Sequence, residues 1–230
     1  MHDPNISIAL NVSRARLQVI GFMLTINIFA LGIFLSSREY QFSLKIISEL
    51  SVFYALVASL CVGTVAALLM LVSERFDPQG NSDVGIFGIA EMTMFVAIVQ
   101  TIDGISKGFI AIFQLNLTEP AFSTFGISGT GELMMASESF RGMIFWLISL
   151  CWVLIVYVIP FWSLSRLPCK PLRKIFFAGY YLVLTGVAFM MSAYAMNIEM
   201  LARGESIGVA RLFLSSLWAP GLWGYSFTPI

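Results

Sequence analysis

Residues 50–72 read LSVFYALVASLCVGTVAALLMLV, an apolar run of 23 residues without a single charged side chain. A transmembrane α-helix needs about 20 predominantly apolar residues to cross about 30 Å of hydrocarbon. The length and composition of this run therefore predict a helix that spans a bilayer.

Four further stretches have the same character, and each is bounded by charged residues or turn formers. Residues 84–101 form the weakest of them, because the segment is short and contains Glu91 and Gln100. Only helices and closed barrels satisfy their backbone groups in lipid, so the expected fold class is all-α, a polytopic transmembrane helix bundle of about five spans. The expected spans are residues 17–35, 50–72, 84–101, 143–164 and 176–196.

The composition of the whole chain agrees with a membrane protein. Hydrophobic residues make up 58% of the 230 residues and charged residues only 11%, and the mean hydropathy is +0.87. A soluble domain is usually about half apolar and about a quarter charged, so the apolar excess is expected to contact the lipid bilayer. The formal net charge is zero, which argues against nucleic acid as a partner because nucleic-acid binding requires a clustered basic surface.

The residue types that catalysis and metal binding usually require are scarce. The cysteines Cys61, Cys151 and Cys169 form no CxxC pair, and the only histidine is His2, close to the N-terminus. A disulfide framework, a zinc site, haem ligation by histidine and Ser-His or Cys-His catalysis are therefore not indicated. We expect no catalytic residue, no metal site, no cofactor and no enzymatic activity. A membrane enzyme that acts on lipid is the least favoured alternative.

Basic residues predict how the chain is oriented in the membrane. Arg14 and Arg16 precede the first expected span, and four more basic residues lie between positions 166 and 174, before the last span. Five spans place both clusters on one side of the bilayer, and short cytoplasmic loops carry an excess of Lys and Arg. We therefore expect a plasma or inner membrane protein with a cytoplasmic N-terminus.

Two stretches are not expected to span the membrane. Residues 103–142 are rich in Gly, Ser and Thr, and we expect an extramembrane loop that begins with Asp103 at the helix exit. A loop of that length is uncommon and often functional. Residues 197–230 mix charged and aromatic side chains, which suits the membrane surface. We expect them to form an interfacial tail that follows the bundle of residues 1–196.

Small residues repeat on single faces of several expected helices. Lipid offers no hydrophobic force between helices, so close approach at small residues and interhelical hydrogen bonds join them. The stripes predict packing within one bundle or, alternatively, against a second copy or another membrane subunit. The packing positions are Ala55, Ser59, Gly63 and Ala67 in the second span, Ala90, Thr93 and Ala97 in the third, and Gln18, Gly21, Thr25 and Gly32 in the first.

Glu91 is the strongest candidate for a functional residue. A charged side chain at bilayer depth costs a few kcal/mol, so it usually faces protein or water and is often functional. The alternative is a structural carboxyl that is hydrogen-bonded to a neighbouring helix. Gln100 and Asn27 are further intramembrane polar groups that we assign to the same candidate ion pathway, although an interhelical hydrogen bond is the simpler interpretation of each.

Two classes of function follow from these residues. The first is an oligomeric channel or transport component for a small ion or solute, which accounts for a buried acid and for the small-residue stripes. The second is a non-catalytic anchoring or scaffold subunit of a larger membrane complex, which accounts for the low charge and the lack of catalytic groups. The first is slightly favoured, because Glu91 is costly to keep in an anchor.

Overall fold

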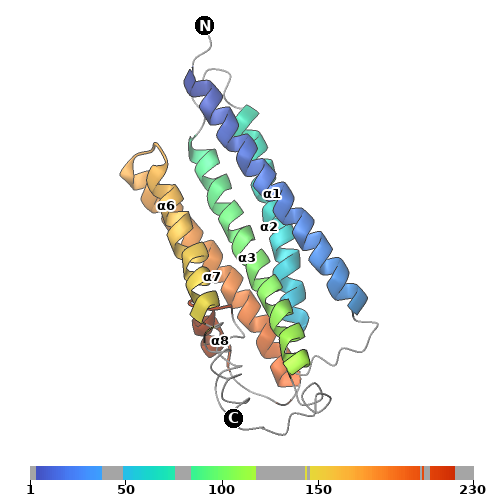
Figure 1. The fold of residues 1–230 in the computed structure, drawn as a ribbon. Helices are drawn as coiled ribbons and strands as arrows, with labels where there is room; N and C mark the ends of the chain where they lie inside the picture. The colour runs from blue at the N-terminus through green and yellow to red at the C-terminus, as the bar shows by residue number, and fades with distance from the viewer. Residues whose placement is uncertain are drawn as a thin grey trace.

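The regular structure of this chain is helical wherever its residues are described. The computed structural model describes residues 4–37, 49–75, 84–117, 143, 146–202, 204 and 208–220. Its elements are α1 (Pro4–Ser37), α2 (Glu49–Arg75), α3 (Val84–Leu117), the π-helix η2 (Leu154–Val158), α6 (Ile159–Arg166), α7 (Pro171–Ala202) and α8 (Val209–Ser216). Residues 146–153 are α-helical and run directly into η2 and α6, so that the three form one continuous helix (Figure 1).

Five of these helices are long and apolar enough to cross a membrane. The spans are Ser13–Leu35, Leu50–Ser73, Gly85–Gly108, Trp146–Arg166 and Pro171–Ala202. The predicted all-α bundle of about five spans is therefore confirmed, including its weakest member, and the protein is an integral membrane protein. Large apolar side chains such as Phe22, Phe29 and Trp146 are 70–74% exposed on the outer surface, where lipid accommodates them without cost.

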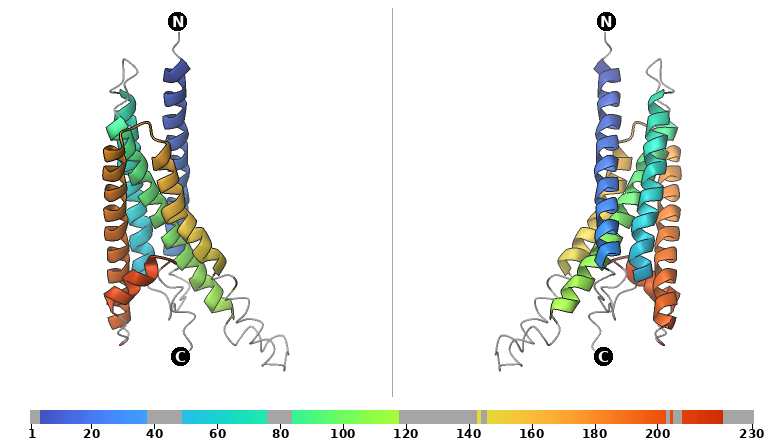
Figure 2. Two further views of the ribbon diagram at one scale, coloured as in Figure 1. Left: turned by 90° about the vertical axis from the view of Figure 1, so that its left-hand side faces the viewer. Right: turned by 90° about the vertical axis from the view of Figure 1, so that its right-hand side faces the viewer.

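The span on α3 lies at the centre of the bundle. It packs against α1, α2, α6, η2 and α7, and 67% of its most apolar window is buried, compared with 17–33% in the other spans. Side views show that α1, α2 and α7 run nearly parallel, whereas α3 and α6 are tilted across them (Figure 2). Because most of this span is buried against other helices, it tolerates the polar residues that made it the weakest span in the sequence.

α3 and α7 continue into segments that were expected from the sequence to form a loop and the C-terminal tail. α3 continues past Thr101 to Leu117, so the first part of the expected 103–142 loop is helical, and Asp103 lies inside the helix. Residues 118–142 lie outside the described part of the chain. α7 continues to Ala202, and the short helix α8 packs against it. Whether α8 lies along a membrane surface stays a prediction.

The small residues predicted on α2 and α3 lie inside the bundle, although not all in one contact, because Thr93 of α3 faces Tyr180 of α7. Ala55, Ala90 and Ala97 are fully buried, and Gly63 is buried where an added Cβ would lie 2.6 Å from Met23 Cε and 3.7 Å from Ala97 Cβ. Ordinary packing within the bundle accounts for these positions. The corresponding face of α1 is different, because its small and polar positions are exposed. These positions are Gln18, Gly21, Thr25 and Gly32.

A Gly88→Ala substitution is expected to destabilise the bundle. A Cβ at this position would lie 2.6 Å from two ring atoms of Phe177, whose side chain is buried. Overpacking of this kind costs about 1–3 kcal/mol, which a lower thermal unfolding midpoint in detergent would report. Gly179→Ala is the matched control, because no atom lies within 4 Å of its added Cβ. Equal midpoints for the two variants would contradict the prediction.

A π-helical turn in the fourth span compensates for the proline that follows it. Pro160 has no N–H and cannot donate to Val156 O, four residues earlier. The Tyr181 hydroxyl of α7 donates to that carbonyl at 2.6 Å, and the Ile159 N–H reaches back five residues to Leu154 O. An unpaired backbone group in the hydrocarbon region costs several kcal/mol, so the Tyr181 hydroxyl stabilises this turn.

Tyr181→Phe is expected to lower the free energy of unfolding by about 1–3 kcal/mol, because it leaves the buried Val156 carbonyl without this donor. Pro160→Ala restores a backbone N–H in the same turn, so the double variant should recover part of the loss. Thermal unfolding of the single and double variants measures both effects. A double variant that is as unstable as the sum of the single changes would show that the two residues do not share this carbonyl.

Candidate intramembrane polar site

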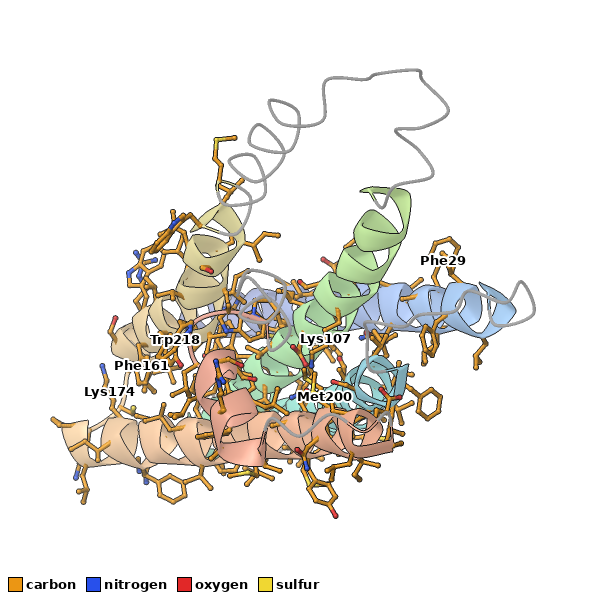
Figure 3. All side chains as sticks on the ribbon, turned by 90° about the horizontal axis from the view of Figure 1, so that it is seen from below. Phe29, Lys107, Phe161, Lys174, Met200 and Trp218 are labelled. Atoms are coloured by element: carbon orange, nitrogen blue, oxygen red, sulfur yellow. The ribbon has the colours of Figure 1, made fainter. Side chains whose placement is uncertain are left out.

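Lys107 and Asp103 form an ion pair inside the bundle, one turn apart on α3. Lys107 is 0% exposed and Asp103 is 2% exposed, and Lys107 Nζ lies 2.5 Å from Asp103 Oδ2. Figure 3, which views the bundle from below, shows Lys107 enclosed by the helices. Two charges buried in this way are stable only when they are paired and their remaining hydrogen bonds are satisfied.

Two serines from other helices complete the surroundings of the pair. Lys107 Nζ donates to Ser51 Oγ of α2 at 2.8 Å and to Ser192 Oγ of α7 at 2.5 Å. An ammonium group has three N–H donors, and Asp103 and the two serines accept all three. Ser192 Oγ also donates to Asp103 Oδ2 at 3.0 Å. Acid, base and hydroxyl groups of three helices are therefore joined in one buried network.

Lys107 was not predicted from the sequence, in which Asp103 was interpreted as a helix exit. The spacing of four residues between them was the available signal, because oppositely charged residues at i and i+4 lie on one face of a helix. The apolar residues that follow, Phe109 to Phe113, were a second sign that the helix continues. Neither signal was used, because the loop was expected to begin at residue 103.

Asn27 lies in a second polar cluster, which joins α1, α2 and α3. Asn27 Nδ2 donates to Ser59 Oγ and to Thr101 Oγ1, both at 2.9 Å. The two hydroxyls are 2.6 Å apart, and Ser59 also donates to Ala97 O. All three polar side chains are buried. The interhelical hydrogen bond, which was the simpler interpretation of Asn27, is what the structure contains.

Glu91 lies near the other end of the span, in an ion pair with α1. Its Oε1 atom is 2.6 Å from Arg16 Nη2 and accepts a hydrogen bond from Ser163 Oγ of α6 at 2.8 Å. Glu91 is 2% exposed, whereas the Arg16 side chain is 33% exposed. Among the described residues, Glu91 Oε2 has no hydrogen-bond partner. Glu91 therefore holds α1, α3 and α6 together.

Gln100 is the third predicted pathway residue, and its surroundings differ from those of the other two. It is 0% exposed, and neither its Oε1 nor its Nε2 atom has a hydrogen-bond partner in the described part of the chain. Gln100 and Glu91 are nine residues apart, which places them on opposite faces of a helix with 3.6 residues per turn. Glu91 contacts α1 and α6, Asn27 of α1 contacts α2 and α3, and Gln100 pairs with no described residue. The three residues therefore do not form one polar cluster.

The chemistry available at these sites is the exchange of protons and the binding of polar groups. The Asp103–Lys107 network contains an acid, a base and two hydroxyls within hydrogen-bond distance of one another. No group of three or more His, Cys, Asp or Glu side chains that could hold a metal ion occurs among the residues described. No protein-family model, curated protein or solved structure matches this chain.

Proposed function

We propose that this protein is a non-enzymatic transport component of a membrane, which moves protons or a small cation past the buried Asp103–Lys107 pair. The observation that supports this proposal is the burial of that pair with hydroxyls of α2 and α7 around it. Replacing a buried ion pair by packed apolar residues is often neutral or stabilising. A contribution to stability therefore does not by itself explain why the chain contains this pair. Intramembrane ionisable groups usually mark ion or proton paths.

Glu91 and the Asp103–Lys107 pair lie in opposite halves of the span on α3. With Gly85–Gly108 as the span, Glu91 lies about 8 Å and Asp103 about 10 Å from its midpoint, on opposite sides, at 1.5 Å per residue. The start of α1 and the start of α7, where the basic clusters lie, are at the same end of the bundle as Glu91 (Figure 1). With that end in the cytoplasm, the Asp103–Lys107 pair lies nearer the opposite surface.

The exposed face of α1 supports assembly with another membrane helix. Gly21 and Gly32 have no atom within 4 Å of an added Cβ, and Gln18 and Thr25 are exposed on the same helix. Small and polar residues are the residues that join helices in lipid. We propose that this face meets a second copy or another subunit.

A scaffold subunit is the second candidate function, and the Glu91–Arg16 pair favours it. The pair links three helices, and its two charges compensate each other. Such a contact stabilises a rigid bundle whether or not the protein transports a solute. A scaffold needs partner chains for activity, whereas a transport component carries flux by itself or as an oligomer.

The test combines composition with flux. The particle is extracted gently from its native membrane, its chains are identified, and the purified protein is reconstituted in liposomes with an internal pH dye. A one-component oligomer with proton or cation flux above that of empty liposomes supports the transport proposal. Several co-purifying chains, together with no flux from the protein alone, overturn it in favour of the scaffold.

A further inference from the structure

Gln100 has more hydrogen-bonding capacity than the surrounding residues use. Its amide offers one acceptor atom and two N–H donors, it is fully buried, and no described residue pairs with either atom. Buried side-chain polar atoms in native proteins are nearly always hydrogen-bonded to protein or to ordered water. The amide is therefore a place where a small polar ligand would be stabilised.

The neighbours of Gln100 along α3 define a polar stripe that faces α7. Thr93, Gln100 and Lys107 follow one another at intervals of seven residues, a spacing that keeps them close to one face of a helix. Thr93 Oγ1 lies 2.9 Å from the Tyr180 hydroxyl of α7, and Lys107 Nζ donates to Ser192 of α7. Gln100 thus lies between two contacts with the same helix, about 10 Å from each along the axis.

We infer that Gln100 binds internal water and that this water connects the Thr93–Tyr180 contact to the Asp103–Lys107 network as a proton path. The inference rests on the proposed transport function and narrows its substrate to the proton. An internal water makes two to four hydrogen bonds, which the amide and adjacent waters provide. A metal cation instead needs several oxygen ligands, and a single neutral amide does not supply them.

Proton transfer along such a path balances without any further reactant. At each step one N–H or O–H bond breaks at the donor and one O–H or N–H bond forms at the acceptor. The waters at Gln100 and the hydroxyls of Thr93 and Tyr180 both donate and accept in this way, whereas the Lys107 ammonium first gives up a proton and then, as the neutral amine, takes one back. No electron is gained or lost, so one positive charge moves for each proton.

The test compares Gln100→Leu with Gln100→Asn in proteoliposomes. Leucine has a similar size but cannot hold water, so proton flux should fall by about tenfold or more, whereas asparagine should retain a larger part of it. The unfolding midpoint of the leucine variant should stay equal or rise, because no described protein group loses a hydrogen-bond partner when the amide is removed. Wild-type flux should be slower in D2O than in H2O, and sodium should not move.

A second readout does not depend on flux. In a background in which Cys61, Cys151 and Cys169 are replaced by serine, Gln100→Cys should react with a small water-soluble thiol reagent, and Val99→Cys should not. Val99 is equally buried but packs in an apolar cluster with Trp152 and Phe189. Labelling of Gln100→Cys without labelling of Val99→Cys supports the presence of internal water at position 100.

The possible failures are distinct. Wild-type protein without flux would overturn the proposed function itself. Wild-type proton flux that Gln100→Leu leaves unchanged, or an unreactive Gln100→Cys, would overturn only the water path. A Gln100→Leu variant that loses stability in proportion to its flux would overturn it as well, because the amide would then have a structural role.

Discussion

The Lys107→Met variant is expected to fold poorly and to lose its ion flux. Without the ammonium group, Asp103 holds a negative charge that is 2% exposed and has lost its counter-ion. Removal of one partner of a buried ion pair costs about 3–5 kcal/mol, a large part of the stability of a domain. The yield of monodisperse protein in detergent and its unfolding midpoint measure this loss.

A double variant separates the loss of folding from the loss of transport. In Asp103→Asn/Lys107→Met neither side chain is charged, so most of the folding loss should be recovered. Proton flux should nevertheless stay at the level of empty liposomes, because the acid and the base are both absent. A double variant that folds and still transports would remove the pair from the mechanism, and the scaffold function would become the better explanation.

The Arg16→Met variant is expected to have the second largest effect, and this effect is on stability. It leaves Glu91 as a buried carboxylate with the Ser163 hydroxyl as its only described partner. A cost of about 3 kcal/mol follows from the loss of its counter-ion. Adding Glu91→Gln in the same chain removes the unpaired charge and should restore the unfolding midpoint.

The Glu91→Gln variant alone distinguishes the two interpretations of Glu91. Because Glu91 and the Thr93–Gln100–Lys107 stripe are on different faces of α3, we expect its proton flux to stay within about twofold of wild type, a change in barrier below about 0.5 kcal/mol. The substituted amide is isosteric with the acid and keeps an oxygen that accepts from Arg16 and Ser163. If flux is lost while the midpoint is retained, Glu91 lies on the path, as the sequence had suggested, and the stripe is not the route.

The three predicted pathway residues show where interpretation from the sequence reaches its limit. Burial of Glu91, Gln100 and Asn27 followed from their positions within apolar spans, and all three are buried. Their partners did not follow, because these come from other helices. Arg16 is 75 positions before Glu91, and Thr101 is 74 positions after Asn27. A local pattern contains no information on which helix lies opposite.

The small-residue stripes indicated which helix faces are suited to close packing, but not which helix packs against each face. The same kind of pattern on α2 and α1 had suggested contacts for both helices. The α2 positions meet α3 inside the bundle, whereas the α1 positions are exposed. Close approach requires small residues on at least one helix, but the helix that approaches is chosen by the topology of the whole bundle.

The sequence by itself determined the five spans, because hydropathy over about 20 residues is a local property of the chain. Only the tertiary structure decided that Lys107 is a membrane-buried cation. Its acceptors on α2 and α7 lie 56 and 85 positions away, and a lysine is stable at that depth only when such groups surround it. Taken alone, the segment after residue 103 resembled a polar loop, and packing of α3 between α2 and α7 made it the continuation of a helix.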